Sequence, residues 1–320
     1  MKTTDALERR YPNQPTATGK RLKTLKGARL DLLQKAAWFG DFPSDHGIKA
    51  LALAGNINEK KNSATLTDLH AEIPKGYTEP FLCYPPKLFP NPEIALPNRR
   101  LHLVHRLSSS AIQFLKDGNR FVERTGGGWT HHERMRSILM WEFYLAHSQK
   151  RDNTFMPHHL FTDALQEMLI PFTFKNKEYQ INLRWDDDFI LDYEARQSLF
   201  ILEADKGNEV NMTEDMRRKS EFRSWLQYRE FIGRGLYRKH FKTDKAAIVL
   251  HVFNKKAKME NVMALHEKWT DGKGSNYHAY RLDTRFEEPD FAAPKVSYDN
   301  YFQPWKRVNK PDLFIERPQD

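Results

Sequence analysis

The stretch from Arg184 to Val252 constrains the fold of this chain more than any other part of the sequence. It contains two apolar runs that carry acids, then a basic segment with helical spacing, and then a third apolar run. Apolar runs bounded by turn signals are typical of buried strands. Two strands followed by a crossover helix and a further strand predict a mixed α/β sheet.

The acids of this stretch stand at the ends of its first two predicted strands. Asp186, Asp187 and Asp188 open the first strand, and Glu203 and Asp205 close the second. Strand alternation places Glu203 and Asp205 on one face, and likewise Asp186 and Asp188. Carboxylates that converge from neighbouring strands can hold Mg²⁺ or Mn²⁺, because these ions prefer oxygen ligands.

A cation close to these acids would complete a site for phosphodiester hydrolysis. The metal would polarise the phosphate and lower the pKa of an attacking water, and the cation would stabilise developing charge. Lys206, Lys219 and Arg223 are the candidates, although Lys206 is expected on the opposite face. The alternative is structural: the aspartates form a solvated strand end, and the later acids pair with basic residues 217–223.

The charge of the chain favours a polyanionic partner. The 320 residues include 51 Lys and Arg against 42 Asp and Glu, a net charge of +9, so nucleic acid is the simplest candidate. The single cysteine, Cys83, excludes an intramolecular disulfide and a cysteine-based zinc site. Since no apolar run is long enough for a signal peptide or a membrane span, we expect a cytoplasmic protein without a membrane partner.

The N-terminal half has the spacing of a helix-turn-helix. Apolar residues recur at helical intervals over 28–39, and a second helix is expected over 44–53 with Ser44 or Asp45 as its cap. A third helix is expected within 58–70. Short helices joined by a tight turn are typical of DNA-binding domains, and they also occur in domains that bind nothing.

The residues that follow have the pattern of a wing. Residues 74–97 are rich in proline and are expected to be irregular or extended, and 102–107 are expected to be a returning strand. Ser108 then caps a helix that ends at Gly118. Together with the helix pair, this pattern predicts a winged helix-turn-helix.

Further elements are expected in the middle of the chain. Helices are predicted over 130–147 and 161–169, and a hairpin is predicted with strands at 170–174 and 179–183. Five histidines occur in or near these helices, namely His131, His132, His147, His158 and His159. Because neighbours in sequence point in different directions, we interpret them as surface or interface histidines rather than as metal ligands.

Behind the acidic strands we expect a helix over 212–237 with Thr213 as its N-cap. A buried strand over 246–253 and a helix over 257–269 follow. From Asp271 onward the chain is polar and rich in proline, so we expect an irregular wrap anchored by aromatic residues.

The run Leu202–Glu209 resembles the Glu-x-Asp-Arg-Gly-Thr-Glu signature of the plasmid replication-relaxation family. Arg184–Phe189 is similar to the Arg-Pro-Asp-x-x-Phe motif of that family, and 226–241 is similar to its Tyr…Gly-x-Tyr…Phe helix end. Upstream, 104–115 is similar to the wing of the family. With the start of the linking helix at Thr130, the resemblance covers about residues 30–269.

The resemblance implies a winged helix-turn-helix fused to a domain similar to the PD-(D/E)xK, restriction-endonuclease-like nucleases, within an α/β (α+β) fold. It implies a role in the replication, mobilisation or relaxation of plasmid and mobile-element DNA. Carried over residue by residue, Asp186 and Glu203 are the metal pair, with Asp205 beside them.

The chain departs from the family pattern at three positions. Trp185 replaces the usual proline, and Asp205 stands where a standard nuclease has its lysine. Ser224 stands where the family has a helical lysine, so that Lys219 or Arg223 would have to substitute for it. These departures bear on catalytic turnover more than on the fold or on DNA binding.

We therefore expect a flexible basic arm over 1–26, a winged helix-turn-helix over 27–150, a nuclease-like domain over 151–272 and an irregular wrap over 273–320. The expected function is Mg²⁺-dependent (or Mn²⁺-dependent) nicking or cleavage of DNA in replication, mobilisation or transposition. The alternative is a replication or transcription factor whose degenerate nuclease-like domain serves as an interface. Double-stranded DNA is the expected partner, and other replication or transposition proteins and a homodimer are open alternatives.

The expected site residues form three groups. The catalytic residues are Asp186, Glu203, Asp205 and Lys219. The metal ligands are Asp186, Asp188, Glu203 and Asp205. The residues expected to contact DNA are Lys49, Lys60, Lys61, Arg99, Arg100, Arg217, Arg218 and Arg223.

Overall fold

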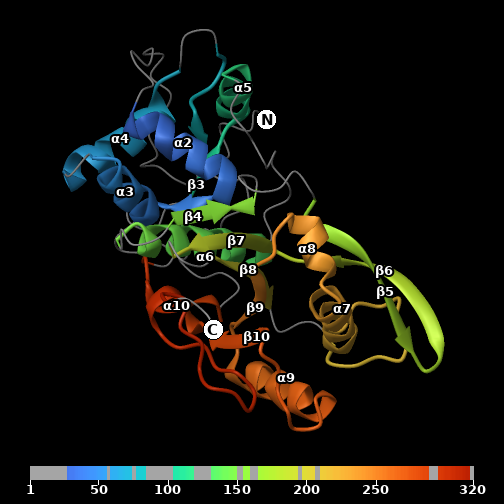
Figure 1. Cartoon of the computed structure of the whole chain (residues 1–320). Coiled ribbons are helices and arrows are strands. Elements are labelled where there is room, and N and C mark those ends of the chain that lie inside the picture. Colours follow the sequence, from blue (N-terminus) through green and yellow to red (C-terminus); the bar gives the residue numbers. More distant parts are fainter. Residues whose placement is uncertain are drawn as a thin grey trace, which may run out of the picture. The chain divides into compact units, whose positions relative to one another are not determined.

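The chain divides into two compact units (Figure 1). The N-terminal unit comprises residues 1–145 and 288–297, and the C-terminal unit comprises 146–287 and 298–320. The computed structural model describes residues 27–55, 58–73, 77–83, 104–118, 131–149, 154–158, 165–193, 197–205, 210–287 and 295–317. The predicted basic arm and most of the predicted wing therefore lie outside the described residues.

The N-terminal unit combines helices with a small antiparallel sheet. In chain order its elements are α2 (Ala28–Phe39), β1 (Phe42–Pro43), α3 (Ser44–Leu53), α4 (Glu59–Ala71), β2 (Leu82–Cys83), β3 (Val104–Leu107), α5 (Ser109–Asp117) and α6 (His131–His147), which runs across the boundary between the units. The strands pair in the order β1-β3-β2. The helices expected at 28–39, within 58–70 and after Ser108 are confirmed, and Asn58 and Ser108 cap theirs through their side chains.

Buried polar side chains connect the elements of this unit. Neither Ser44 nor Asp45 caps α3, because both are helical residues and Pro43 stands at the N-cap. The Oγ of Ser44 instead lies 2.7 Å from Nε2 of His105 on β3. Nδ1 of His105 lies 2.6 Å from Nε2 of His70 on α4. Gly40 ends α2 with a φ of 90°, where a Cβ atom would meet Oγ of Ser137 at 2.6 Å.

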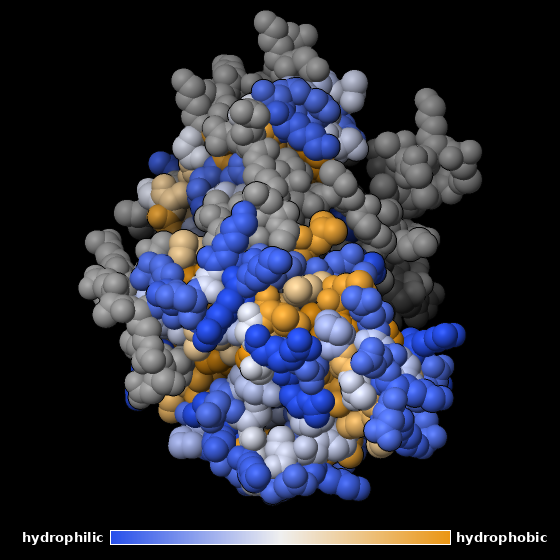
Figure 2. Space-filling model, turned by 45° about the vertical axis from the view of Figure 1, so that its right-hand side comes forward, coloured by the Kyte–Doolittle hydropathy of each residue, from blue (hydrophilic) through white to orange (hydrophobic). Residues whose placement is uncertain are grey.

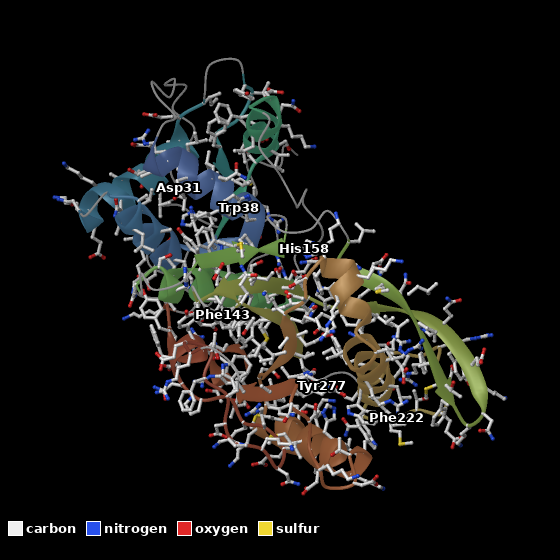
Figure 3. The ribbon with its side chains drawn as sticks, viewed as in Figure 1. Asp31, Trp38, Phe143, His158, Phe222 and Tyr277 are labelled. Carbon is white, nitrogen blue, oxygen red and sulfur yellow. The ribbon has the colours of Figure 1, made fainter. Side chains whose placement is uncertain are left out.

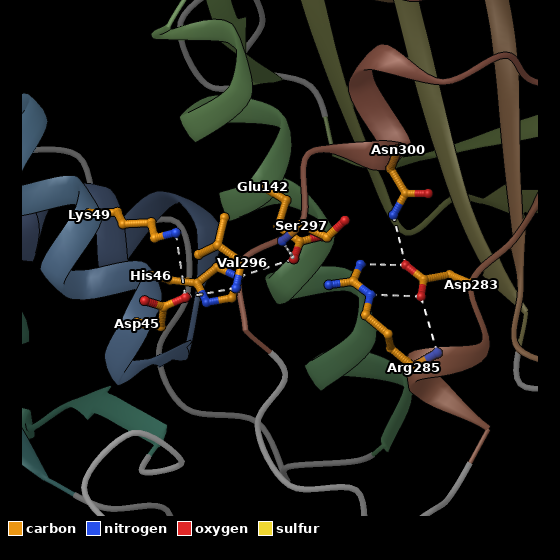
Figure 4. Close-up of polar contacts among 9 residues, drawn as sticks. All are labelled: Asp45, His46, Lys49, Glu142, Asp283, Arg285, Val296, Ser297 and Asn300. Carbon is orange, nitrogen blue, oxygen red and sulfur yellow. Dashed lines mark hydrogen bonds and ion pairs between the residues drawn. The ribbon is translucent and has the colours of Figure 1, made fainter.

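The segment around Val296 returns to this unit through two carboxylates (Figure 4). The backbone N–H of Val296 donates to Asp45 at 2.9 Å, and that of Ser297 donates to Glu142 at 2.9 Å. Glu142 is buried and also lies 3.4 Å from Nε2 of the buried His46. These bonds satisfy backbone donors of a segment that belongs to no helix or strand.

The C-terminal unit is built on a mixed five-stranded sheet. Its elements are β4 (Thr154–Pro157), β5 (Glu167–Phe174), β6 (Lys177–Arg184), β7 (Asp187–Asp192), β8 (Gln197–Asp205), α7 (Glu221–Gly233), α8 (Leu236–Phe241), β9 (Ala246–Phe253), α9 (Lys256–Trp269), β10 (His278–Leu282), the 3-10 helix η3 (Thr284–Phe286) and α10 (Asp299–Phe302). The strand order is β10-β9-β8-β7-β4. The strands β8, β9 and β10 are parallel, and β7 and β4 are antiparallel to their neighbours. The mixed α/β class that the sequence predicts is confirmed at this level.

The helices α7 and α9 cover the same face of this sheet. Ile201 and Val249 share one core with residues of α7, and Phe253 and Tyr280 share another with Val262 of α9. The register pairs Ile201 with Val249, so alternation puts these residues and Phe253 on one face. Crossovers between parallel strands that advance in one direction place their helices on one side.

A separate hairpin, β5–β6, packs on α7. Its two-residue turn has positive φ at Lys175 (50°) and Asn176 (60°), the conformation of a tight β-hairpin turn. Phe172 belongs to a core cluster with Phe222 of α7, and Gln227 of α7 donates to the carbonyl of Ile181 at 2.8 Å. The helix predicted over 161–169 is wrong where the structure describes it, since β5 begins at Glu167, and 161–164 lie outside the described residues.

Two further predictions are corrected after the acidic strands. Residues 212–220 are not helical, because α7 begins at Glu221 and Ser220 caps it by accepting from the N–H of Arg223 at 3.2 Å. Thr213 makes a local turn instead, accepting from the N–H of Asp215. The segment predicted to be irregular, 273–320, also contains the strand β10, which pairs in parallel with β9.

Aspartate bonds fix the end of β10. Asp283 accepts from Nε of Arg285 at 2.9 Å and from the amide of Asn300 on α10 at 2.8 Å (Figure 4).

No described helix combines the length and the apolar character needed to cross a membrane.

Candidate functional site

The pairing of β7 with β8 brings Asp186 and Glu203 together. Asp187 is paired with Leu202, so Asp186 and Glu203 stand opposite each other one position further along. The backbone N–H of Asp186 donates to the carbonyl of Leu202 at 3.1 Å, and its carboxylate accepts from the N–H of Ala204 at 2.7 Å. Both acids are half-buried, so they remain partly accessible to water or to a ligand.

The polar row continues across the sheet beyond Glu203. Glu203 is in register with His251 on β9, and His251 is in register with Tyr280 on β10. Asp186, Glu203, His251 and Tyr280 therefore form one row on the face covered by α7 and α9. A row of four polar side chains on a covered sheet face is unusual, because such positions are normally apolar.

Tyr228 of α7 lies over this row. Its hydroxyl donates to Oε1 of Glu203. Burial raises the pKa of Tyr228 well above its usual value, and the charges of Glu203, Asp186 and Asp188 raise it further. The phenol therefore stays protonated and remains a donor to the carboxylate.

Three histidines are buried beside this tyrosine. Nε2 of His251 lies 2.9 Å from Nδ1 of His278, and His266 of α9 bonds to the hydroxyl of Tyr280. The rings of His278 and Tyr228 meet edge to face at 5.9 Å. Burial lowers the pKa of His251 to about 3 and the pKa of the other two well below the usual value, so all three are neutral at pH 7.

The next acid along β7, Asp188, is held by other side chains. Its carboxylate lies 2.7 Å from Nδ1 of His158, a residue labelled in Figure 3, and accepts from the indole N–H of Trp185 at 2.6 Å. Asp188 is fully buried. Asp187 points to the opposite face of the sheet, where it accepts from Gln166 at 3.0 Å. Asp188 is thus integrated into the core, whereas Asp186 is half-exposed.

A lysine that the sequence analysis did not select lies at the same end of the sheet. Nζ of Lys258 on α9 lies 3.9 Å from Asp205 and 3.4 Å from Glu221, and it donates to Asn211 at 2.8 Å. Its side chain is only 10% exposed. Lys258 lies in the first turn of α9, the helix that directly follows the parallel strand β9. Such a turn lies at the carboxyl end of the parallel strands, here β8 and β9. The position of Lys258 just after a predicted strand could therefore have identified it as a residue near the acids.

The basic residues expected near the acids are placed differently from one another. Lys219 is exposed on the segment before α7, as are Arg217 and Arg218. Arg223 is buried, and its guanidinium donates to the carbonyls of Met216 and Arg217 at 3.4 and 2.9 Å. Arg223 thus stabilises the loop that precedes α7 through hydrogen bonds to two of its carbonyls.

Basic residues of the N-terminal unit lie on α3 and α4. Lys60 and Lys61 are exposed in the first turn of α4, and Lys49 on α3 lies 3.7 Å from Asp45. Outside the described residues lie Arg99, Arg100 and Lys206.

The helix histidines were interpreted as surface or interface residues, and a surface position is wrong for two of them. His147 and His158 are buried, because His147 packs against Phe155 at 5.8 Å and His158 is bonded to Asp188. His132 is half-buried, and the side chain of His131 and all of His159 lie outside the described residues.

The carboxylates fit a divalent metal only as a pair. Within the described ranges, no group of three or more His, Cys, Asp and Glu side chains is arranged to hold a metal ion. Asp186 and Glu203 remain as two oxygen donors on adjacent strands, and Mg²⁺ is commonly bound through one or two carboxylates with water and phosphate as its other ligands.

Comparisons with known proteins leave the family open. No protein-family model matches the sequence, and no curated protein or solved structure is similar enough to count as a match.

Proposed function

We propose that the C-terminal unit is a metal-dependent endonuclease that nicks or cleaves double-stranded DNA. The observation that carries the proposal is the facing pair of Asp186 and Glu203 on adjacent strands, both half-buried on one sheet face. Two carboxylates in this arrangement are the usual means of holding a divalent metal against a phosphodiester.

The order of elements supports the same proposal. Strands β4, β7 and β8 pair antiparallel, and the crossover through α7 and α8 leads to β9, which is parallel to β8. This is the arrangement expected of a PD-(D/E)xK-like domain, with the acids at the start of its second strand and the end of its third. The proposed biological setting is the replication, mobilisation or transposition of a plasmid or another mobile element.

Each residue of the site has a role in this proposal. Asp186 and Glu203 would hold Mg²⁺, which when bound polarises the phosphate and lowers the pKa of an attacking water. Tyr228 fixes the orientation of Glu203 through its hydrogen bond. The ammonium group of Lys258, next to Asp205, would stabilise charge that develops on the phosphate, in place of the lysine missing from the motif.

The N-terminal unit has the proposed role of binding DNA. Its chain order, α2-β1-α3-α4-β2-β3 with a sheet ordered β1-β3-β2, is consistent with a winged helix-turn-helix. In such a domain α4 would be the helix that enters the major groove, and it carries the exposed Lys60 and Lys61. The net charge of +9 supports the same partner.

The test is cleavage of supercoiled plasmid by the full chain with Mg²⁺, Mn²⁺ or EDTA. We expect Asp186→Asn and Glu203→Gln each to lower the rate of metal-dependent nicking at least about a thousandfold, because each removes a charged metal ligand. Asp192→Asn, at the opposite end of β7, is the matched control and should nick at the wild-type rate. Nicking that survives both site substitutions would refute the proposed site.

One observation favours a second, non-catalytic function. Glu203 already accepts a hydrogen bond from Tyr228, and Asp186 already accepts one from Ala204. Such a network is also consistent with a nuclease-like domain that has lost catalytic activity. The domain would then bind DNA or another protein in a replication or transcription factor. A wild-type protein that binds duplex DNA and nicks it under none of the metal conditions would establish this second function.

A further inference from the structure

The short helix α8 has one buried side and one strongly basic side. Tyr237 and Phe241 are almost completely buried against the core below it. Arg238, Lys239 and Lys242 are exposed on the other side. Arg234 before the helix and Lys245 after it extend the same cluster, which we call the α8 basic surface (Arg234, Arg238, Lys239, Lys242 and Lys245).

This surface has few counter-charges. Glu230 lies 3.8 Å from Arg234, and Asp244 lies 3.0 Å from Lys245. In the part of the chain that the structure describes, no carboxylate pairs with Lys239 or Lys242. Asp244 also attracts Arg238, so two acids face the five cations of this surface. Cations in excess of the acids repel one another, and a bound polyanion reduces that repulsion.

The backbone of this surface is held in place. Gly235, with a φ of 67°, precedes α8, and Lys242, with a φ of 51°, ends it, so that the helix is bounded by two left-handed residues. The hydroxyl of Tyr237 donates to the carbonyl of Lys245 at 2.7 Å and accepts from Nε of Arg238 at 3.3 Å. The cations are thus presented from a fixed segment, which lowers the entropy cost of binding.

The helix packs on Trp185, two residues before β7, and on His158, directly after β4. His240 and Phe241 pack on the ring of Trp185 at 5.2 and 5.5 Å, and Phe241 also contacts His158 at 6.1 Å. Trp185 precedes Asp186 directly in the chain, so α8 is anchored beside the strand that carries one of the two acids. Lys245 leads into β9 at the other end of the sheet, where Ala246 is in register with Ser198. Figure 2 brings this side of the molecule forward and shows strongly hydrophilic residues beside a hydrophobic patch.

We infer that the α8 basic surface binds the sugar-phosphate backbone of double-stranded DNA, on the same unit that carries Asp186 and Glu203. This inference rests on the proposed function. Phosphate fits better than an acidic protein partner, because the two exposed residues of α8, Arg238 and Lys239, are both cations, and Leu165 beside His240 is a single exposed apolar side chain. None of these cations was among the residues that the sequence analysis expected to contact DNA.

The test measures binding in EDTA, so that it does not depend on cleavage. Lys239→Gln with Lys242→Gln is compared with Lys268→Gln with Lys273→Gln, a control that removes the same charge from exposed positions at the end of α9. The readout is fluorescence anisotropy of a labelled duplex with the full chain over a range of salt concentrations. We expect the α8 double variant to bind about tenfold more weakly than the control, with a slope of log K against log salt that is smaller by about 1.8, or about 0.9 per lost phosphate contact.

The outcomes test the α8 inference separately from the proposed endonuclease. Equal affinity and equal slope in the α8 variant and its control would overturn the α8 inference, whether or not the wild type nicks plasmid. A weakened α8 variant, with a wild type that never nicks, would support the α8 inference and refute the proposed endonuclease. Tighter binding to polyglutamate than to duplex DNA would overturn the phosphate assignment in favour of an acidic protein partner.

Discussion

The two faces of the mixed sheet in the C-terminal unit differ by one polar row. The face that α7 and α9 cover also holds apolar residues such as Ile201 and Val249. On the face that α7 and α9 cover, neighbouring strands align Asp186, Glu203, His251 and Tyr280. The opposite face is apolar over most of its area and carries an aromatic stack, in which Phe189 lies 5.3 Å from Phe200 and 5.0 Å from Phe155. The same strands form both faces, because successive side chains along a strand point to opposite sides of the sheet.

This difference separates what holds the unit together from what it does. Burying polar side chains costs free energy unless each finds a partner, so a fold gains little stability from a polar row that an apolar row would not supply better. The aromatic face shows that these strands can carry an apolar row. The polar row is where we place the proposed active site.

Substitution on the aromatic face should have the largest effect on stability. Phe200 is completely buried and stacks on Phe189, so Phe200→Ala should lower the free energy of unfolding by about 3–5 kcal/mol. Glu203→Gln, on the half-exposed edge of the polar face, should lower it by less than about 1 kcal/mol. Urea unfolding of both variants measures the two values. Equal losses would contradict the division of roles between the faces.

Acid should destabilise the C-terminal unit through the buried histidines beside Tyr228. Because burial depresses the pKa of His251 to about 3, the folded chain keeps this ring neutral where the unfolded chain binds a proton, below about 6.5. His266 and His278 are shifted in the same direction. Stability should thus be independent of these groups above pH 7 and fall as the pH drops below 6.5, by up to about 1.4 kcal/mol per pH unit for each histidine.

A single substitution isolates this dependence from that of the other buried histidines in the chain. His278→Gln removes one titrating ring and should make the slope of unfolding free energy between pH 6.5 and 5 shallower by up to about 1.4 kcal/mol per pH unit. Urea unfolding at several pH values provides the slopes. Identical slopes in the wild type and the variant would show that His278 is not the neutral buried group described above.

Local sequence patterns predicted much of the fold. The helix at 28–39 and the strand at 246–253 were predicted with their bounds, because apolar period and burial agree there. The strand β10 was missed, since His278 and Tyr280 are buried in a polar network that the apolar pattern does not detect. The helix predicted at 212–237 was too long. The apolar residues before Ser220 continue the helical spacing, and this spacing masked Ser220 as the N-cap of α7, which begins at Glu221.

The candidate site was predictable only in part, for a related reason. Asp186 and Glu203 are placed by pairing between consecutive strands, which the sequence indicates directly. Lys258 joins Asp205 across 53 positions because α9 follows a strand parallel to β8, and the register of that pairing is tertiary information. The same holds for His251, which meets Glu203 only through the parallel pairing of β8 with β9.

Removal of the hydroxyl group of Tyr228 should have only a small effect on stability. Tyr228→Phe keeps the ring in its core and removes one hydrogen bond to Glu203, which is half-exposed and can recover a bond from water, so the loss should be about 1 kcal/mol. If Tyr228 positions a metal ligand, the Mg²⁺ concentration for half-maximal nicking should rise by about tenfold, as for other residues that orient a ligand. Tyr237→Phe is a matched control, because it removes a hydroxyl that bonds the carbonyl of Lys245 and not an acid. An unchanged Mg²⁺ requirement in Tyr228→Phe, with the expected loss of stability, would make the bond to Glu203 a structural feature of the polar face and would erase the distinction between the two faces at this position.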